Sequence, residues 1–552
     1  MSQPSPALVC NVRDFGAVGD GRTLDSPAIN RAIEAASQAG GGVVMLPAGT
    51  YLSFSIRLRS HLTLQFQPGA TLLAATPHRD GGTYDAAEPN EWGDRQYQDF
   101  GHSHWHDALI WGEHLEHVAI VGPGLIHGQG LSHGLEPKPA TSGGPAPIEA
   151  GPNGTLAPVT EPAPAQTHEP GPGYKAIALK RCRHVTLRDF SMLRAGWFAV
   201  LATGVDHLTI DNLRIDTNRD GLDLDSCRHV RIAHCAINTP HDDAIVLKSS
   251  YALGTARACE NITIANCQVS GFDLGTFLDG TCGRTGWKAP DQDGPCGRIK
   301  FGTESNGGYR NVVISNCVFL RSRGLAFETV DGGALEDVSV TNIVMREVSN
   351  APLFFRIGNR GRGPAGLPIG AIRRVSLSHI TVSDCDARYP ILIAGLPGHP
   401  VEQLRLHDIH VTFRGGLSLD DAARQPAELI NPFFLRDPAV AQPRDPYEPP
   451  EQERAYPEPS MFGILPAYGL FVRHARQVTI DGLTLAHTLP DSRPPVVVMD
   501  AENITLDGLD AQRDETGLTV VLRRVRGFRA RRGRDLPDLN LAHADAELIV
   551  SP

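Results

Sequence analysis

A short pattern of alternating apolar and polar residues returns along most of this 552-residue chain. In each copy Val, Ile or Leu recur at every second position, and in all but the first copy Asn, Asp or His follows before another apolar residue. The copies are HVAIVG at 117, HVTLRDF at 184, HLTIDNL at 207, HVRIAHC at 229, NITIANC at 261, NVVISNC at 311, DVSVTNI at 337, RVSLSHI at 374, QLRLHDI at 403, QVTIDGL at 477 and NITLDGL at 503. Where neighbouring copies are closest they start 22 to 26 residues apart, which is typical of solenoid coils made of short strands and turns. The pattern predicts an all-β protein built as a parallel β-helix.

The segment before the repeats carries the pattern of one amphipathic helix. Pro27 suits a first helical turn, Asp25 or Ser26 can cap it, and the glycines from Gly40 to Gly42 end the pattern. The expected apolar stripe consists of Ile29, Ala32, Ile33 and Ala36. We expect this helix to plug the open end of the solenoid, with residues 1–75 forming the cap and the first coils.

Three wider gaps between the copies predict loop insertions in one domain that spans residues 1–552. Residues 134–173 are rich in Pro, Gly, Ala and Thr, a composition that cannot form a core, so we expect them to run over the surface. Residues 271–298 and 416–470 are the other two insertions. Long loops of this kind are often functional covers, and these are expected to wall a cleft.

Two acidic clusters, Asn218-Arg219-Asp220-Gly221 and His241-Asp242-Asp243, lie about one coil apart. Residues one coil apart in a solenoid lie one above the other, so Asp220, Asp242 and Asp243 are expected to share one small area. Crowding raises the pKa of at least one carboxyl group, which allows one to act as an acid and another as a base. The structural alternative is that such residues cap backbone N–H groups at solenoid turns.

Other polar residues near these clusters are given accessory roles. Asp223 and Asp225 alternate with leucines along one expected strand, which predicts turn-binding or solvent-facing side chains. His102, His104 and His106 alternate as a strand would place them on one face. Hydrogen bonding to substrate or solvent is favoured over a metal site there. No cofactor or metal is expected.

The NxDGxD and xDDAIxxK stretches resemble the catalytic segment of glycoside hydrolase family 28, the polygalacturonase family. The opening FGAxGDGxxxDxxAI and GGGVVxxPxGxY is similar to that of family 28 and other pectin-acting β-helix proteins, and YPEPSMFGILPAYGLFVRH at 456–474 is similar to bacterial members. The resemblance implies Asp242 as the general acid, Asp220 and Asp243 as the residues that activate water, and inversion at the anomeric carbon. With the usual chirality of parallel crossovers, it also implies a right-handed, pectin-lyase-like β-helix.

Two stretches depart from the family pattern, and both bear on the substrate. CGRIKFGTESNGG is the best match to a GHG-type stretch, and it places Gly297 where the family has His. The RIK-type triplet, which in the family holds the galacturonate carboxylate, matches Ala326-Phe327-Glu328, so a cationic pair is replaced by Ala and Glu. Arg298 and Lys300 are expected to restore positive charge from the neighbouring coil, because an Arg fork suits a carboxylate. The sugar is therefore left open.

The remaining candidates for substrate binding are polar or aromatic. Lys248 is expected either to hold developing charge or a substrate carboxylate, or to form a salt bridge to Asp220 or Asp243. Trp197, one coil before the acidic cluster, is the favoured platform for the apolar face of a sugar. The other expected substrate contacts are Asn218, Glu304 and Glu328. For the two glutamates, solvated or turn-capping roles are the alternative.

The charge and composition of the chain disfavour two classes of binding partner. The formal net charge of −11 argues against nucleic acid or an anionic membrane, because both require a basic surface. No apolar run approaches the ~20 residues needed to span a bilayer, and the opening MSQPSPALVC lacks the features of a signal peptide. The resemblance implies a secreted or periplasmic protein, with the cytoplasm as the alternative. Cys282 and Cys296 are close enough in sequence to form a bridge in an oxidising compartment.

These observations predict an inverting glycoside hydrolase that acts on a pectic or related plant polysaccharide or oligosaccharide. Loops that close one end of the cleft favour exo action. A β-helix polysaccharide lyase is one alternative; it would use a Lys or Arg base, often with Ca²⁺, and would make the acidic cluster a metal site. A noncatalytic glycan-binding solenoid is the other.

Overall fold

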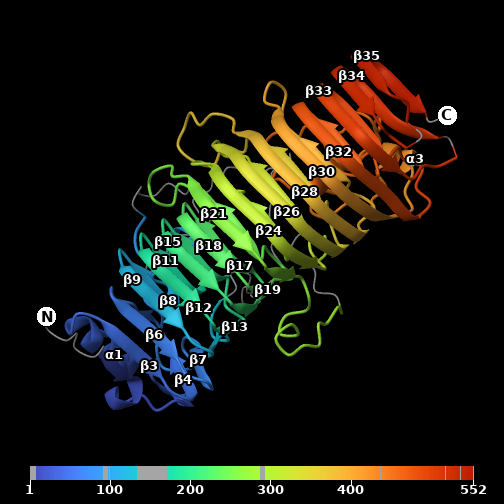
Figure 1. The fold of residues 1–552 in the computed structure, drawn as a ribbon. Coiled ribbons are helices and arrows are strands. Elements are labelled where there is room, and N and C mark those ends of the chain that lie inside the picture. The colour runs from blue at the N-terminus through green and yellow to red at the C-terminus, as the bar shows by residue number, and fades with distance from the viewer. Residues whose placement is uncertain are drawn as a thin grey trace. The chain divides into compact units, whose positions relative to one another are not determined.

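The computed structural model describes residues 8–90, 97, 100–132, 171–285, 293–435, 437–515, 517–534 and 536–550. The chain forms two compact units (Figure 1). Unit 1 comprises Met1–Pro145, Ala163–Gln268 and Phe272–Gly286, and unit 2 comprises Ala146–Pro162, Val269–Gly271 and Trp287–Pro552. Most of the predicted insertion at 134–173 and part of that at 271–298 lie outside the described residues. The single domain over 1–552 stays a prediction.

Unit 1 is built from short strands that stack in parallel, coil on coil. Its strands are β1 (Val9–Asn11), β2 (Asp20–Leu24), β3 (Gly42–Leu46), β4 (Gly49–Ser53), β5 (Ile56–Arg57), β6 (Leu62–Phe66), β7 (Ala70–Ala74), β8 (Ala108–Glu113), β9 (Glu116–Val121), β10 (Leu125–His127), β11 (Lys175–Lys180), β12 (Arg183–Arg188), β13 (Ser191–Leu193), β14 (Phe198–Thr203), β15 (Asp206–Asp211), β16 (Arg214–Asp216), β17 (Asp220–Asp225), β18 (Arg228–Ala233), β19 (Ala236–Asn238), β20 (Ile245–Lys248) and β21 (Cys259–Ala265). Successive coils pair as β11–β14–β17–β20, as β12–β15–β18–β21 and as β10–β13–β16–β19. The predicted parallel β-helix is confirmed.

The apolar positions of the repeat stack inside these coils. Val185 faces Val118 on one side and Leu208 on the other, and Leu208 in turn faces Val230, which faces Ile262. All five side chains are at most 2% exposed. Burying an aliphatic side chain of this size contributes roughly 1.5–3 kcal/mol. The alternation seen in the sequence therefore fixes which side of each strand faces the core.

The first residue of the repeat stands in a left-handed turn. His117, His184, His207 and His229 all have φ of 56°, and Asn261 has φ of 60°. The four imidazoles stack face to face, with ring centroids 4.7, 4.8 and 4.8 Å apart along the ladder. Protonation would place like charges at these short separations, which is unfavourable.

The histidine ladder makes the stability of unit 1 depend on pH. Desolvation lowers the pKa of His184 below 6.5, and the neighbouring His117 and His207 lower it further. The unfolded chain therefore takes up the proton first, so stability is full above pH 6.5 and is lost as the pH falls below it. We expect the melting temperature to drop between pH 7.5 and 5.5, and His184→Asn to drop less, since Asn tolerates this backbone conformation. An equal drop in both proteins would contradict the role given to the ladder.

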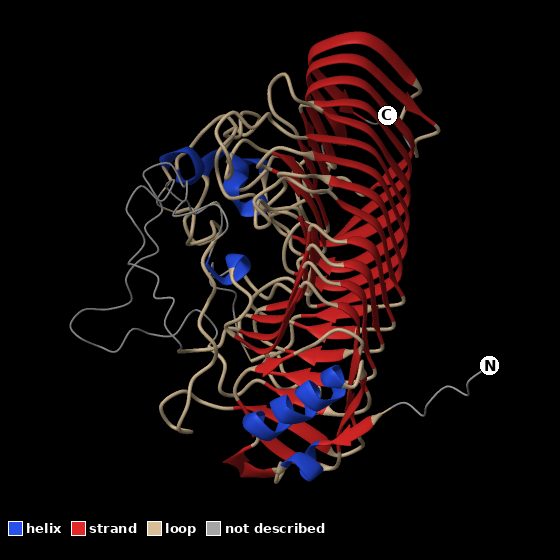
Figure 2. Cartoon of the chain, turned by 90° about the vertical axis from the view of Figure 1, so that its left-hand side faces the viewer, coloured by secondary structure: helices blue, strands red, loops and turns tan. Residues whose placement is uncertain are grey.

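The predicted N-terminal helix is α1 (Ser26–Gln38), which follows η1 (Val12–Phe15). Ile29, Ala32, Ile33 and Ala36 are buried, as the stripe predicts, and the helix packs against β1, β3 and β5 (Figure 2). Asp25 is the N-cap, but its carboxylate accepts from the N–H groups of Val18 and Gly19 and makes no cap hydrogen bond. The helix covers the first coils of unit 1.

Unit 2 has longer strands and a packed, irregular segment. Its strands are β23 (Ile299–Phe301), β24 (Tyr309–Leu320), β25 (Leu325–Thr329), β26 (Ala334–Val348), β27 (Leu353–Ile357), β28 (Ala371–Cys385), β29 (Ile391–Ala394), β30 (Val401–Gly415), β31 (Leu470–Arg473), β32 (Ala475–Leu489), β33 (Val496–Ala511), β34 (Leu518–Arg531) and β35 (Leu539–Val550); β22 (Gln268–Ser270) falls at the boundary in sequence between the units. Consecutive long strands pair in parallel, except for the antiparallel pair of β34 and β35.

The segment 416–470, expected as a long loop, contains α3 (Leu419–Arg424), α4 (Pro438–Ala441) and η2 (Pro459–Phe462). Its Phe434, Met461 and Phe462 are buried against strand residues such as Phe354 and Phe471. This apolar core, shared with the strands, explains why the described part of the insertion packs on the sheet and is not a bare loop. Among the described residues, no helix is long and apolar enough to cross a membrane. All ten cysteines are described, and none forms a disulfide, so Cys282 and Cys296 are not bridged.

Candidate active site

The two acidic clusters lie one coil apart in unit 1, as their spacing predicts. Asp220 is the first residue of β17, and Asp242 and Asp243 stand in the turn that leads into β20. The N–H of Gly221 donates to the carbonyl of Asp243 at 3.0 Å, which sets the register of the two coils at this point. Each of the three aspartates offers a carboxylate oxygen within 4.8 Å of the others. The structure thus brings the three carboxylates together.

Asp220 and Asp243 are the two buried members of this carboxylate cluster. Each is 3% exposed, whereas the side chain of Asp242 is 26% exposed. Burial raises the pKa of Asp220 well above 3.8, and the nearby charge of Asp242 raises it further, while Lys248 opposes the shift. A carboxyl group shifted in this way retains its proton towards neutral pH. The cluster therefore places a carboxyl that favours its proton beside a partly exposed neighbour.

Asp242 is held by an arginine that lies on a tryptophan. Nη2 of Arg219 donates to Oδ2 of Asp242 at 2.9 Å, and the N–H of Asp243 donates to Oδ1 of Asp242 at 3.1 Å. The Arg219 guanidinium lies 4.8 Å from the ring centroid of Trp197, which precedes β14 one coil earlier. The expected aromatic platform is thus near the acidic cluster, with a cation stacked on it.

Lys248 pairs with Asp223, and the salt bridge to Asp220 or Asp243 that the sequence suggested stays a prediction. Its Nζ lies 3.2 Å from Oδ2 of Asp223, and Nε2 of His102 lies 3.2 Å from the same oxygen. Lys248 and His102 also contact each other. Asp223 is fully buried, as is Asp225, so the solvent-facing alternative for these two residues was wrong.

His102 comes from α2 (Phe100–Ser103), far from the acidic clusters in sequence. The predicted strand across His102, His104 and His106 is not formed, because a short helix takes the first of them into the site. His102 also packs edge-on against Phe198, with ring centroids 4.6 Å apart. Sequence reasoning did not place His102 beside Asp223 and assigned no role to Arg219. A charged residue inside the NxDG pattern was the available signal for Arg219.

Two sets of possible metal ligands share Asp220, namely His102–Asp220–Asp223 and Asp220–Asp242–Asp243. Both sets already contact a protein cation, since Lys248 pairs with Asp223 and Arg219 pairs with Asp242. These ammonium and guanidinium groups supply the counter-charge that a cation would bring. The donor set therefore fits an ion-paired carboxylate site better than a metal site.

The pKa shift of Asp220 predicts that this residue costs stability. A raised folded-state pKa means that stability falls as the pH rises from 3.8 through the raised value. We expect Asp220→Asn to raise the free energy of unfolding by about 0.5–2 kcal/mol at pH 8, the usual size of a stabilising substitution, and to give no gain at pH 4. Urea unfolding at the two pH values checks this.

Asp225 offers a matched control for that substitution. It is equally buried, but it accepts hydrogen bonds from the N–H and hydroxyl of Ser250 and from the hydroxyl of Ser226. An amide at this position would oppose one donor with another, so Asp225→Asn should destabilise the protein at both pH values. A loss of stability in Asp220→Asn at pH 8 would contradict this prediction. It would show that nearby cations and donors stabilise the ionised Asp220 more than burial destabilises it.

The other predicted substrate residues lie in unit 2, where they are buried in ion pairs. Arg298 donates to both oxygens of Glu458, at 3.1 and 2.6 Å. Nζ of Lys300 lies 3.5 Å from Glu328, and Glu304 lies 3.2 Å from Nη2 of Arg360. A sugar carboxylate would have to replace these partners. Their role in substrate binding stays a prediction.

Gly297, which stands where the family has His, has no room for a side chain. Its φ is +52°, and a Cβ atom there would lie 2.2 Å from the carbonyl oxygen of Ser270. The backbone of Ser270 therefore lies too close to Gly297 for a histidine side chain to fit at this position.

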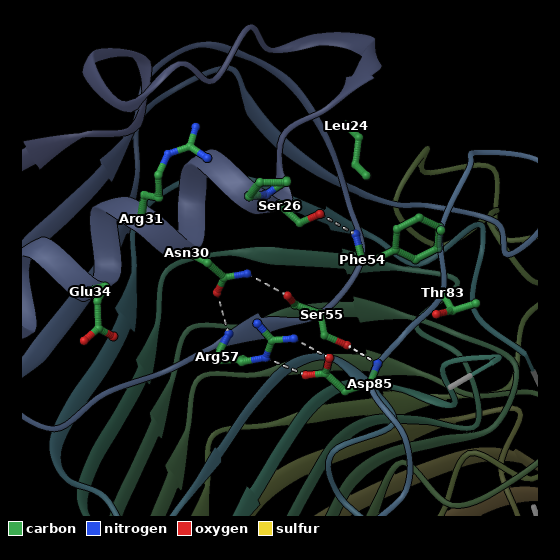
Figure 3. Close-up of a pocket in the computed structure, with 12 residues that line it drawn as sticks. Leu24, Ser26, Asn30, Arg31, Glu34, Phe54, Ser55, Arg57, Thr83 and Asp85 are labelled. Atoms are coloured by element: carbon green, nitrogen blue, oxygen red, sulfur yellow. Dashed lines mark hydrogen bonds and ion pairs between the residues drawn. The ribbon is translucent and has the colours of Figure 1, made fainter. Parts of the chain in front are cut away.

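A separate pocket of about 500 Å³ opens beside α1 (Figure 3). Its polar side chains satisfy one another: Arg57 forms a bidentate pair with Asp85, and Asn30 donates to the carbonyl of Ser55 (Figure 3). The pocket shares no lining residue with the carboxylate cluster. Its paired polar groups give no reason to assign it the chemistry.

Comparison with known proteins finds similarity to β-helix proteins named for action on pectin. Residues 9–94 match the family model "Rhamnogalacturonase A/epimerase, pectate lyase-like". A probable polygalacturonase of Vitis vinifera is 26% identical over 369 residues, which cover 63% of this chain and 62% of that protein. The chain is thus similar to polygalacturonases over about three fifths of its length. It spans about three fifths of the length of this curated relative.

Solved structures of polygalacturonase-like proteins share the fold. A family 28 exopolygalacturonase of Yersinia enterocolitica has a TM-score of 0.60 at 16% identity, covering 92% of this chain and 80% of that one. An exopolygalacturonase of Thermotoga maritima has a TM-score of 0.54 at 21% identity, covering 74% and 88%. The polygalacturonase-like chain is a right-handed, pectin-lyase-like parallel β-helix, as predicted.

Proposed function

We propose that this protein is an inverting glycoside hydrolase that removes sugar units from the ends of a pectic or related plant polysaccharide or oligosaccharide. The observation that carries the proposal is the group of three carboxylates within 4.8 Å of one another, one buried with a raised pKa and one partly exposed. Glycoside hydrolysis needs such a pair, because one carboxyl group protonates the leaving oxygen and another activates water. The names of the sequence relative and of the two similar structures support a galacturonate-containing substrate and exo action.

The roles follow the family resemblance. Asp242, the most exposed of the three, is the group that a glycosidic oxygen reaches first, and it acts as the acid. Asp220 and Asp243 hold the water, and Lys248 balances the charge near Asp220. The carboxylate oxygens are closer than the about 6.5–9.5 Å of most inverting enzymes. Inversion therefore rests on the resemblance and not on the spacing.

The substrate also bears on the location. A polymeric substrate lies outside the cell, which supports the secreted or periplasmic location that the resemblance implies. An imported oligosaccharide would fit the cytoplasm.

A proton NMR time course on oligogalacturonates and pectic polysaccharides tests the proposal, with ultraviolet absorbance followed in parallel. The expected result is a new reducing end that first appears as the inverted anomer, without unsaturated product. Unsaturated product would select a lyase and overturn the hydrolase. A first product of retained configuration would support hydrolysis but contradict the inverting mechanism.

A further inference from the structure

Arg219 connects three parts of the site in unit 1. Its guanidinium stacks on Trp197, bonds Oδ2 of Asp242 and follows directly after Asn218 in the turn before β17. The side chain is 14% exposed, more than that of Lys248, which is 8% exposed and paired with Asp223. Arg219 is therefore the more accessible of these two cations beside the carboxylates.

Arg219, Trp197 and Asn218 each hold a polar atom that finds no hydrogen-bond partner among the described residues. These atoms are Nε of Arg219, Nε1 of Trp197 and Oδ1 of Asn218, and all three are buried. Two are donors and one is an acceptor. Buried polar groups in folded proteins are nearly always paired, and each one left unpaired calls for an explanation. The hydroxyl and carboxylate groups of a sugar are partners of the kind that such donors and acceptors need.

We propose that Arg219 binds the carboxylate of an acidic sugar. This binding releases Arg219 from Asp242, and Asp242 then takes up the proton that it gives to the leaving oxygen. This inference rests on the proposed function and names its substrate class as uronate-containing glycans. A guanidinium has five N–H donors and a planar fork that matches a carboxylate. A ligand carboxylate competes with Asp242 for that fork, whereas a neutral sugar offers no charge with which to do so.

The proton balance follows from the charges of the site. In the free protein the guanidinium bonds Asp242, and the proton of the pair is on Asp220, which burial and the neighbouring carboxylates favour. When the ligand takes Arg219, Asp242 loses its counter-charge and accepts the proton that Asp220 gives up. Asp220 is then an ionised base beside Lys248 and Asp243, and Asp242 is the acid. One proton changes place, and none enters or leaves the site.

Comparison of a charged with a neutral substrate tests this. We would measure kcat/KM for trigalacturonate and for its carboxyl-reduced counterpart with wild type and with Arg219→Gln. The variant should lose about 10- to 100-fold on trigalacturonate, the usual worth of a charge-assisted hydrogen bond. Its loss on the reduced trisaccharide should be several-fold smaller, because that ligand offers the guanidinium no carboxylate. Arg219→Lys keeps the charge without the fork and should recover part of the loss.

Arg257→Gln is the matched control. Arg257 is 18% exposed and forms a bidentate pair with Asp206 in the same unit, so its loss reports the cost of removing a paired arginine. It should change both substrates equally. Equal losses on both substrates in Arg219→Gln, or no loss on either, would overturn the proposal.

A binding measurement separates this inference from the proposed function. Isothermal titration calorimetry with trigalacturonate and its reduced counterpart needs no turnover. Selective loss of trigalacturonate affinity in Arg219→Gln would support the acid-sugar site even in a protein that hydrolysed neither compound. In that case only the proposed hydrolase function would be contradicted. Unchanged affinity for trigalacturonate would overturn the inference, whatever the activity.

Discussion

Asp242→Asn is expected to lower kcat on oligogalacturonates by about 10²- to 10⁴-fold, the range for loss of a general acid. An amide cannot give a proton to the leaving oxygen. Asp242 is 26% exposed and has its hydrogen bonds at the rim of the cluster, so the free energy of unfolding should change by less than about 1 kcal/mol. Steady-state kinetics and urea unfolding on the same preparation measure the two effects.

A substrate that needs no acid sharpens this result. An aryl galacturonide with a good leaving group departs without protonation, so Asp242→Asn should retain much more of the activity on it than on oligogalacturonate. Asp211→Asn removes a partly exposed aspartate that pairs with His234 away from the cluster, and it should leave both activities unchanged. Wild-type activity of Asp242→Asn on oligogalacturonate would refute its role as the acid.

Lys248→Met is expected to produce the largest loss of stability, about 3–5 kcal/mol. Nζ of Lys248 lies 3.2 Å from Asp223, whose side chain is completely buried, so its removal leaves an uncompensated buried charge. Because neighbouring Asp220 also loses its opposing cation, activity should fall as well. Chemical denaturation at pH 7 checks the size of the loss.

The double variant Lys248→Met with Asp223→Asn is the control. Removing the stranded carboxylate should restore part of the stability, and the difference gives the coupling between the two residues. A loss below about 1 kcal/mol in Lys248→Met would show that His102, 3.2 Å from the same carboxylate oxygen, supplies the counter-charge instead.

The contact between the two acidic clusters could be predicted from the sequence because it depends on one number. A coil length near 22 residues, repeated in register, places Asp220 beside Asp243 independently of the conformation of the loops. The position of Trp197 one coil earlier follows from the same periodicity. Local contacts along a repeat are set by the pattern of strands and turns.

The counter-charges could not be predicted in the same way. Lys248 pairs with Asp223, a contact that the sequence analysis did not suggest. Register puts Asp225 beside Lys248, and Asp223 lies on the same face of the strand because side chains alternate. His102 reaches the same aspartate from a segment more than one hundred residues earlier, as a four-residue helix and not as a strand. No periodicity links these positions.

The coil, the buried face of each strand, the N-terminal helix and the meeting of three carboxylates could all be predicted from the sequence alone. All of these follow from alternation, repeat length and helix signals, which act over short distances along the chain. The folded structure was needed to learn which cation faces which carboxylate, that 416–470 shares an apolar core with the strands, and that Arg219 lies between Trp197 and Asp242. Such choices depend on side chains that are distant in sequence and compete for the same buried space and charge.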